Sequence, residues 1–318
     1  MTALRRLVLL FPPFVVQGWI PCASQRQLHR IVPSRLHSTA EEVFEGTITI
    51  IDQSPHHLVV AKPPAVVCHH SGWTGSRNRL EVPMIQRVRE AIGRKVNAVH
   101  RLDRGASGCL LMTYYDDGNS TCQLQEAMTM NANKTYVALV RGEGILHGVD
   151  FKQQGWFCID RPIKDESGKL NNATTYFRFV AGQDDNGDGS RPRASLVLAR
   201  PVTGRWHQIR RHLNGLSHPI LGDSSHGGSK TNQEWRKRGL AGERTCLHLL
   251  QLILPPTDYT PDWIHAFCPL ADDMMEMLET HLPQVLEDAQ PILVQEGISL
   301  RPSPSASHTT LPFRVPLE

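Results

Sequence analysis

Short runs of apolar residues separated by polar turns follow one another along the chain from about residue 46. Seven of these runs predict β-strands, because they are short, rich in β-branched side chains and bounded by turn-forming residues. They are TITIID (47–52), HLVVA (57–61), GCLLMT (108–113), KTYVALV (134–140), TTYFRFV (174–180), ASLVLAR (194–200) and LHLLQLIL (247–254).

Two other stretches have apolar residues at helical spacing. The first stripe comprises Met84, Ile85, Val88 and Ile92, and the second comprises Trp206, Ile209, Leu213 and Leu216. The strands and helices alternate irregularly, without a repeating βαβ unit. This pattern predicts an α+β fold whose central sheet is mixed and mostly antiparallel, arranged in two lobes with a cleft.

Polar segments mark the predicted boundaries of the domains. GQDDNGDGSRP (182–192) is turn-forming throughout and predicts an exposed hairpin loop. RPSPSASHTT (301–310) predicts loose order, so residues 284–318 are expected to form a partly disordered C-terminal extension. No linker interrupts residues 46–283, which we expect to form one domain.

The first forty residues have the composition of a targeting peptide. They contain five arginines and no acidic residue before Glu41. An organellar presequence, mitochondrial in preference to plastid, is favoured over a secretory signal built on LVLLFPPFVV (7–16), and the cytoplasm remains the alternative if the segment is not cleaved. The apolar run is too short and too broken by prolines to span a bilayer, so the mature protein is expected to be soluble.

Charge and cysteine content narrow the classes of function. The 34 Lys and Arg against 31 Asp and Glu give a formal net charge of +3, so any case for nucleic-acid binding depends on where the cations lie. The seven cysteines are odd in number and include no C-x-x-C pair. They predict a reducing compartment and no structural zinc.

Three sequence features imitate known sites without meeting their requirements. GDSSHGGSK (222–230) begins like a phosphate loop, but Gly228 and Ser229 stand where Lys and Ser or Thr are needed. His207 and His212 are five residues apart, which separates them by about 140° on a helix and prevents joint metal binding. The paired histidines at 56–57 and 69–70 have no partners at metal-ligand spacing.

A charged cluster in AVHRLDRGASG (98–108) surrounds Asp103 with arginines. A solvated surface ion pair is the simplest interpretation, worth only about 0–1 kcal/mol. The helix containing Ile209 offers another, because Arg210 lies about 100° from Ile209 on the flank of the buried stripe, whereas Arg211 faces outward. An arginine at the margin of a core requires an anionic partner, and Asp103 is a candidate.

Five ordered motifs together resemble the RluA-type pseudouridine synthase family, and most closely its tRNA pseudouridine synthase C (TruC) branch. They are VVAKPPAVVCHH (59–70), HRLDRGASGCLLM (100–112), KTYVALVRG (134–142), TGRWHQIRRHLNGLSHPILGDSSHG (203–227) and LHLLQLILPP (247–256). The resemblance implies the pseudouridine synthase fold, with residues 46–283 as the catalytic domain. It also implies isomerisation of a uridine in tRNA or rRNA, with no cofactor and no metal.

The resemblance assigns catalytic roles to three residues. Asp103 is implied to be the essential carboxylate, which must be ionised whether it attacks the sugar, attacks the base or takes a proton from the ribose. Arg210 is implied to pair with it. Tyr136 is implied to pack against the uracil and to serve as a base toward C5.

Other residues are implied to contact RNA. Arg101 would fill the gap left by a flipped uridine, stacking its planar guanidinium where the base was. Further implied contacts are His100, Arg104, Arg205 and Arg211. The implied partner is RNA alone, and the protein is expected to be a monomer that does not bind a membrane.

The sequence departs from the family pattern at two positions. Ala106 replaces the usual Thr and predicts an altered loop stability, and Ala65 replaces a usual Gly, which matters only if that turn has a positive φ.

A catalytically silent RNA-binding module would not need Asp103, Tyr136 and Arg210 together. A metal-dependent hydrolase lacks ligand spacing and would be excluded by activity that survives EDTA.

Overall fold

The computed structural model describes residues 43–70, 81–116, 118–187, 192–302 and 308–316. Residues Glu41–Glu318 form one unit, distinct from Met1–Ala40. The predicted targeting peptide therefore lies outside the described residues. Within the described part of the chain, no helix combines the length and the apolar character needed to cross a membrane.

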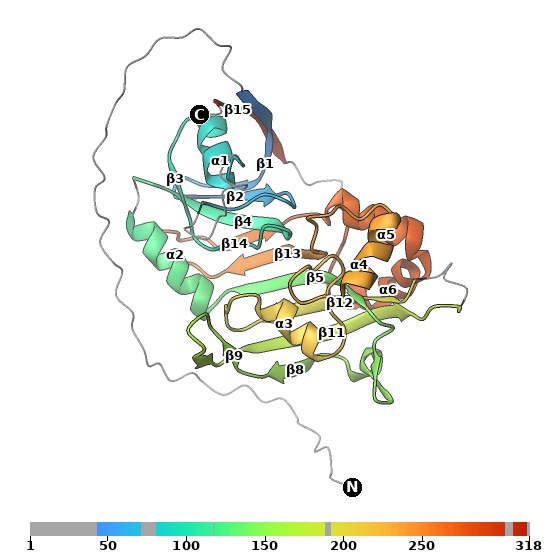
Figure 1. The fold of residues 1–318 in the computed structure, drawn as a ribbon. Helices are drawn as coiled ribbons and strands as arrows, with labels where there is room; N and C mark the ends of the chain where they lie inside the picture. Colours follow the sequence, from blue (N-terminus) through green and yellow to red (C-terminus); the bar gives the residue numbers. More distant parts are fainter. Residues whose placement is uncertain (1–42, 71–80, 117, 188–191, 303–307, 317–318) are drawn as a thin grey trace. The chain divides into compact units, whose positions relative to one another are not determined.

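One large β-sheet forms the centre of the fold in the described residues (Figure 1). Its continuous path runs in the order β15-β1-β2-β4-β13-β5-β12-β11-β8, with β3 and β14 paired to β4 and β13. The strands are β1 (Val43–Gln53), β2 (His57–Lys62), β3 (Val96–Ala98), β4 (Ser107–Tyr114), β5 (Asn133–Arg141), β8 (Phe157–Asp160), β11 (Thr174–Gln183), β12 (Ala194–Pro201), β13 (Leu247–Leu254), β14 (Ile264–Phe267) and β15 (Thr309–Pro316). All seven predicted strands are confirmed.

The sheet is antiparallel except where β4 lies beside β13. At this parallel pair Ser107 is opposite His248 and Gly108 is opposite Leu249. Gly108 has a φ of +115°, and a Cβ at this position would lie 2.2 Å from the Leu249 carbonyl oxygen. Only glycine allows this close approach, which fixes the loop before β4 against the middle of the sheet.

The remaining elements are shorter or helical. They are two small strand pairs, β6 (Ile145–Leu146) with β7 (Val149–Asp150) and β9 (Ile163–Lys164) with β10 (Leu170–Asn171), a 3₁₀ turn (Phe151–Gln154), and the helices α1 (Met84–Ile92), α2 (Gly118–Met130), α3 (Gln208–Gly215), α4 (Ser229–Lys237), α5 (Asp272–His281) and α6 (Pro283–Gln295). Helix α1 confirms the first predicted helical stripe. The mixed sheet with helices confirms the predicted α+β class.

Two apolar clusters form the core, and the sheet carries both. One contains side chains of β5, β11, β12, α5 and α6, and the other contains side chains of β1, β2, β4, β13 and α1. Tyr136 on β5 packs against both clusters. This residue therefore lies where the two clusters meet.

The C-terminal segment differs from its prediction as a partly disordered extension. Residues 283–295 form α6, whose Val285, Ala289 and Leu293 are buried, and β15 pairs with β1 over eight positions. The polar composition around residues 301–310 concealed this strand, and part of that segment, residues 303–307, lies outside the described residues. Pro312 and Pro316 are compatible with β15 because it is an edge strand.

Candidate active site

A cavity of about 490 Å³ opens between the loop that precedes β4 and the segments on either side of α3. Asp103 and Arg210 both line it. Arg210 Nη1 donates to Asp103 Oδ2 at 2.8 Å, so the predicted pairing of these side chains is present. Arg210 is buried on α3, whereas the Asp103 side chain is 23% exposed and reaches the cavity.

A second carboxylate fixes the arginine from the other side. Arg210 donates from Nε to Asp223 Oδ2 and from Nη2 to Asp223 Oδ1, both at 2.7 Å. Burial raises the pKa of Asp223, but the hydrogen bonds and charge of Arg210 outweigh it, and the net shift is downward. The bidentate contact locks the guanidinium plane, and this leaves Nη1 directed at Asp103.

Histidines border the carboxylate cluster at the start of α3. His207 Nε2 lies 3.7 Å from Asp103 Oδ2, and its Nδ1 is 3.0 Å from His226 Nε2. Burial lowers the pKa of His207 to about 4, so the ring is neutral at pH 7. The residue has a φ of +54°, an unusual conformation for a side chain other than glycine, and it turns the ring toward the site.

Trp206 differs from its prediction as a buried member of the α3 stripe. It precedes the helix, which begins at Gln208, and 50% of it is exposed. Its ring stacks on His207 with a centroid separation of 3.9 Å. The helical spacing failed here because the chain leaves helical geometry at His207, and this presents the indole to solvent beside the cavity.

Lys62 stabilises the loop that carries Asp103 through hydrogen bonds. It is fully buried, and its Nζ donates to the carbonyl oxygens of Ala106 at 2.6 Å, Pro63 at 2.9 Å and Arg104 at 3.2 Å. Burial lowers the pKa of Lys62 to about 8, so the ammonium form still predominates at pH 7. Three carbonyl acceptors compensate its desolvation and fix the loop that carries Asp103.

Arg244 supports the same loop from the strand side. It is fully buried, and its Nη1 donates to the Gly105 carbonyl oxygen at 3.0 Å. The backbone N–H of Thr245 donates to that oxygen as well, also at 3.0 Å. The loop around Asp103 is therefore held by two buried cations, although Ala106 offers no hydroxyl for this purpose.

Tyr136 is not among the described residues that line the cavity. Burial, together with the negative charge of Asp103, raises the pKa of the Tyr136 phenol. The phenol is therefore protonated at neutral pH. This state suits packing and hydrogen-bond donation better than the role of a base toward C5.

The two arginines that flank Asp103 in sequence have different surroundings. Arg101 is exposed and lines the cavity, and its side chain has no ion pair or hydrogen bond to the rest of the described chain. Arg104 is bound to two carboxylates, with Nε 2.7 Å from Glu81 Oε2 and Nη1 2.7 Å from Glu243 Oε1. The Arg101 guanidinium thus has no ion-pair partner among the described residues, whereas Arg104 is already neutralised within the protein.

The other predicted RNA contacts also differ in availability. Arg205 is exposed and donates to the Asn172 carbonyl oxygen at 3.0 Å, and Arg211 donates to the Lys164 carbonyl oxygen at 2.7 Å. His100 Nε2 accepts the backbone N–H of Leu111 at 3.1 Å, and burial lowers its pKa to about 4. Its observed contact is structural. The RNA-binding roles of all these side chains stay predictions.

Sequence reasoning missed Lys62 and Arg244, which hold the Asp103 loop, and two residues around Arg210 and the start of α3. Asp223 was overlooked because its segment resembles a phosphate loop, although a buried Arg210 has room for two carboxylates. Gln208 accepts from the Thr203 hydroxyl and the Arg205 backbone N–H, which fixes the chain entering α3. The described residues contain no cluster of three or more His, Cys, Asp or Glu side chains that could hold a metal ion.

Comparison with protein families identifies the class of this site. The family described as RNA pseudouridylate synthase matches residues 56–215, half of the 318-residue chain. The chain belongs to this family. The match contains Asp103, Tyr136 and Arg210 but ends before Asp223.

Individual relatives agree with the family match. A tRNA pseudouridine synthase C from Yersinia pestis is 36% identical over 208 residues, which cover 64% of this chain and 77% of the relative. The protein of the same name from Pectobacterium carotovorum is 33% identical over 222 residues, covering 65% of this chain but only 55% of the relative. The matched region is thus little more than half of that bacterial protein.

Two solved structures have the same fold as this chain. Human RNA pseudouridylate synthase domain containing 1 has a TM-score of 0.54 at 21% identity, covering 80% of this chain and 97% of its own. Human RNA pseudouridylate synthase domain containing 4 has a TM-score of 0.53 at 22% identity, covering 74% of this chain and 92% of its own. These similarities confirm the pseudouridine synthase fold.

Ala65 lies two residues after Pro63 and has a φ of +63°, a backbone conformation that favours glycine. A left-handed backbone conformation costs a residue with a Cβ about 1–2 kcal/mol, and glycine avoids this cost. Glycine also loses more conformational entropy on folding than alanine, which cancels part of the gain. Ala65→Gly is therefore expected to raise the free energy of unfolding by about 0.5–1 kcal/mol, measured by urea denaturation. Ala289→Gly, in the interior of α6, should instead lower it by at least a similar amount, and equal effects at both positions would contradict this account.

Proposed function

We propose that this protein converts a uridine in tRNA into pseudouridine, with Asp103 as the essential carboxylate. The observation that carries the proposal is the buried array in which Asp223 orients Arg210 and Arg210 holds Asp103 at the wall of the cavity. Membership of the pseudouridylate synthase family and the names of its bacterial relatives support RNA, and tRNA in particular, as the substrate.

The reaction is an isomerisation that balances without an external reagent. The bond between uracil N1 and ribose C1′ breaks, the base rotates, and a bond forms between C5 and C1′. The proton on C5 is lost to a base and N1 gains a proton from the surroundings. The protein must hold both fragments while the glycosidic bond is open, which a cavity with ordered walls achieves.

Asp103 is positioned to present one oxygen to the substrate. Its Oδ2 is bound to Arg210 and lies near His207, whereas its Oδ1 has no hydrogen-bond partner in the described chain. Attack on the sugar, attack on the base and removal of a ribose proton would each use a free oxygen of the ionised carboxylate. Tyr136, which is protonated, would pack under the uracil.

A stacked uridine must leave its helix to reach Asp103, because the carboxylate lies in a recess. Flipping costs a few kcal/mol, and a planar side chain inserted into the stack offsets part of that cost. Arg101 is exposed two residues from Asp103, at the rim of the same cavity. We assign it the place of the flipped base.

The proposal is tested by incubating the full chain with a pool of unmodified tRNA transcripts. Carbodiimide treatment followed by primer extension should reveal a new stop at a defined uridine. A parallel map of organellar and cytosolic RNA from cells with and without the gene identifies the natural position. Absence of pseudouridine from every transcript incubated with folded protein would contradict the proposal.

The variant Arg101→Ala is expected to impair duplex substrates selectively. A uridine embedded in a duplex should lose about tenfold more kcat/KM than the same uridine placed in an unpaired loop, because only the duplex requires unstacking. Release of tritium from RNA labelled at uridine C5 measures both rates. Arg89→Ala, at an exposed arginine paired with Glu90, is the matched control, and equal losses on both substrates would refute the wedge role.

A further inference from the structure

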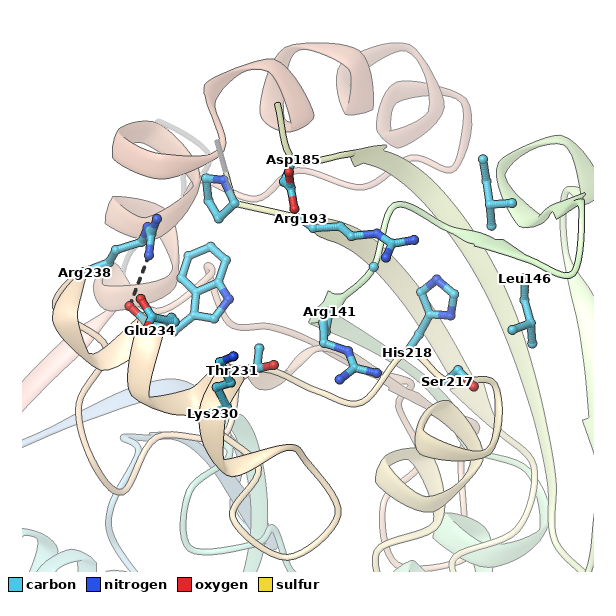
Figure 2. Close-up of a pocket in the computed structure, with 14 residues that line it drawn as sticks. Arg141, Leu146, Asp185, Arg193, Ser217, His218, Lys230, Thr231, Glu234 and Arg238 are labelled. Atoms are coloured by element: carbon cyan, nitrogen blue, oxygen red, sulfur yellow. Dashed lines mark hydrogen bonds between the residues drawn. The ribbon is translucent and has the colours of Figure 1, made fainter. Parts of the chain in front are cut away.

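A second and larger cavity, of about 650 Å³, lies on the other side of the loop that follows Asp223. It is formed by the end of β5, the start of α4, the turn after α3 and the β11–β12 hairpin. Its charged lining residues are mostly cationic: Arg141, Arg193, Lys230 and Arg238 against Asp185 and Glu234. Figure 2 shows Arg141 between the first residues of α4 and the Ser217–His218 turn.

Two of these cations have no anionic partner within the described residues. Arg193 is bound to Glu143 and lies 3.3 Å from Asp184, and Glu234 is bound to Lys237 at 2.8 Å. The side chains of Arg141 and Lys230 are exposed, and neither forms an ion pair or hydrogen bond with the rest of the described chain. The charge of Lys230 is partly offset by Glu234, one turn along α4, whereas no acidic side chain of the described residues pairs with Arg141 at the cavity.

Other groups in the cavity favour an anion beside Arg141. Helix α4 has no acidic residue in its first turn and no side-chain cap, because its N-cap is Gly228. A Cβ built on Gly228 would lie 3.7 Å from both Arg141 Nη1 and Thr231 Oγ1, so these two donors border one small open space. The positive end of the helix dipole adds to the attraction of that space for an anion.

Two stretches of backbone link residues near Asp103 to residues at this cavity. Tyr136 and Arg141 are five residues apart on β5, which corresponds to about 17 Å along a strand. Asp223 and Gly228 are also five residues apart, and the Gly227 N–H donates to the Asp223 carbonyl oxygen at 2.9 Å. We infer that an RNA chain whose uridine occupies the first cavity would reach the second with a phosphate a few nucleotides away.

We propose that the space between Arg141, Lys230 and Gly228 is a phosphate-binding site that holds a backbone phosphate of the RNA substrate. The inference rests on RNA being the substrate, as proposed above. The segment GDSSHGGSK fails as a phosphate loop, yet its last residue, Lys230, lines this cavity. Binding here would position the RNA strand without taking part in the chemistry at Asp103.

A pair of variants at Gly228 tests the site by filling it. Gly228 has φ −82° and ψ 126°, which any residue adopts, and both Asp and Asn cap helices well. Gly228→Asp places a carboxylate beside Arg141 and should weaken binding of a fluorescein-labelled unmodified tRNA transcript about tenfold relative to Gly228→Asn. Equal affinities of the two variants would overturn the proposal.

Removal of the cations provides an independent measurement. The double variant Arg141→Gln, Lys230→Gln should lower the slope of log affinity against log salt by about one for each phosphate that the protein no longer neutralises. It should raise KM and leave kcat at saturating RNA within about twofold, since Asp103 is untouched. The double variant Arg301→Gln, Arg314→Gln, which removes two exposed cations elsewhere, is the control for net charge.

The outcomes separate this inference from the proposed function. Wild-type RNA affinity and salt slope in the Arg141 and Lys230 variant would refute RNA binding at this site, even if the protein forms pseudouridine. Thermal stabilisation of the wild type by inorganic phosphate, absent in the variant while RNA affinity is unchanged, would assign the site to a free phosphate compound and refute RNA as its ligand. A difference between the Gly228 variants in RNA affinity, without pseudouridine formation, would support the site and contradict the proposed reaction.

Discussion

Asp103→Asn is expected to abolish pseudouridine formation while leaving the fold and the RNA affinity nearly unchanged. The amide keeps the shape of the carboxylate but cannot act as a nucleophile or a base, so kcat should fall roughly a thousandfold or more. Arg210 keeps its bidentate contact with Asp223, so the free energy of unfolding should change by less than about 1.5 kcal/mol. Tritium release from C5-labelled tRNA measures the rate, and urea denaturation measures the stability.

A surface carboxylate provides the matched control for this substitution. Asp116 forms an exposed ion pair with Arg94 at 2.8 Å, and Asp116→Asn should retain full activity. Turnover by Asp103→Asn within tenfold of the wild type would remove Asp103 from the reaction.

Asp223→Asn is expected to affect both stability and activity. Asp223 is fully buried and supplies two of the three hydrogen bonds of Arg210, and loss of its charge leaves a buried cation poorly compensated. The free energy of unfolding should fall by about 3 kcal/mol at pH 7. Activity should fall by about a hundredfold at a temperature where the variant is folded, because the guanidinium is no longer locked toward Asp103.

The effect of Asp223 should also depend on pH in a defined direction. Its pKa is lowered in the fold, so its contribution is present above the unfolded-state value of about 3.9 and is lost as pH falls through the lowered folded value. The stability difference between the wild type and Asp223→Asn should therefore shrink below about pH 4. Glu279→Gln, at an exposed pair with Arg301, should cost less than about 1 kcal/mol throughout, and an equal cost at both positions would contradict the buried role of Asp223.

The sequence predicted the central strands because burial imposes a continuous apolar run on them. All eight residues of β4 are buried, for example, and its sequence is uninterrupted by charge. Elements with a weaker pattern escaped prediction. Helix α4 is dominated by polar side chains and buries only Asn232 and Trp235, and α6 contains Pro291 in its interior.

The sequence predicted only the part of the site that is formed by the α3 helix and the loop containing Asp103. The position of Arg210 beside the α3 stripe indicated a buried cation, and the charged loop supplied Asp103. Asp223 reaches Arg210 through the turn after α3, and Lys62 reaches the loop from the neighbouring strand β2, so neither contact follows from local spacing. His207 shows a further limit, because its positive φ turns Trp206 out of the helix that the periodicity predicts.

The pairing of β1 with β15 joins residues as far apart in sequence as Val43 and Pro316. During synthesis the chain emerges from its N-terminal side, so β1 is made long before the strand that covers it. Until then its backbone N–H and C=O groups form an open edge that can pair with another chain. A nascent chain stalled before residue 309 therefore carries the open edge of β1 even if Asp103 and Arg210 have already met, whereas in the finished fold the edge strand is β15, whose two prolines make it a poorer template for pairing.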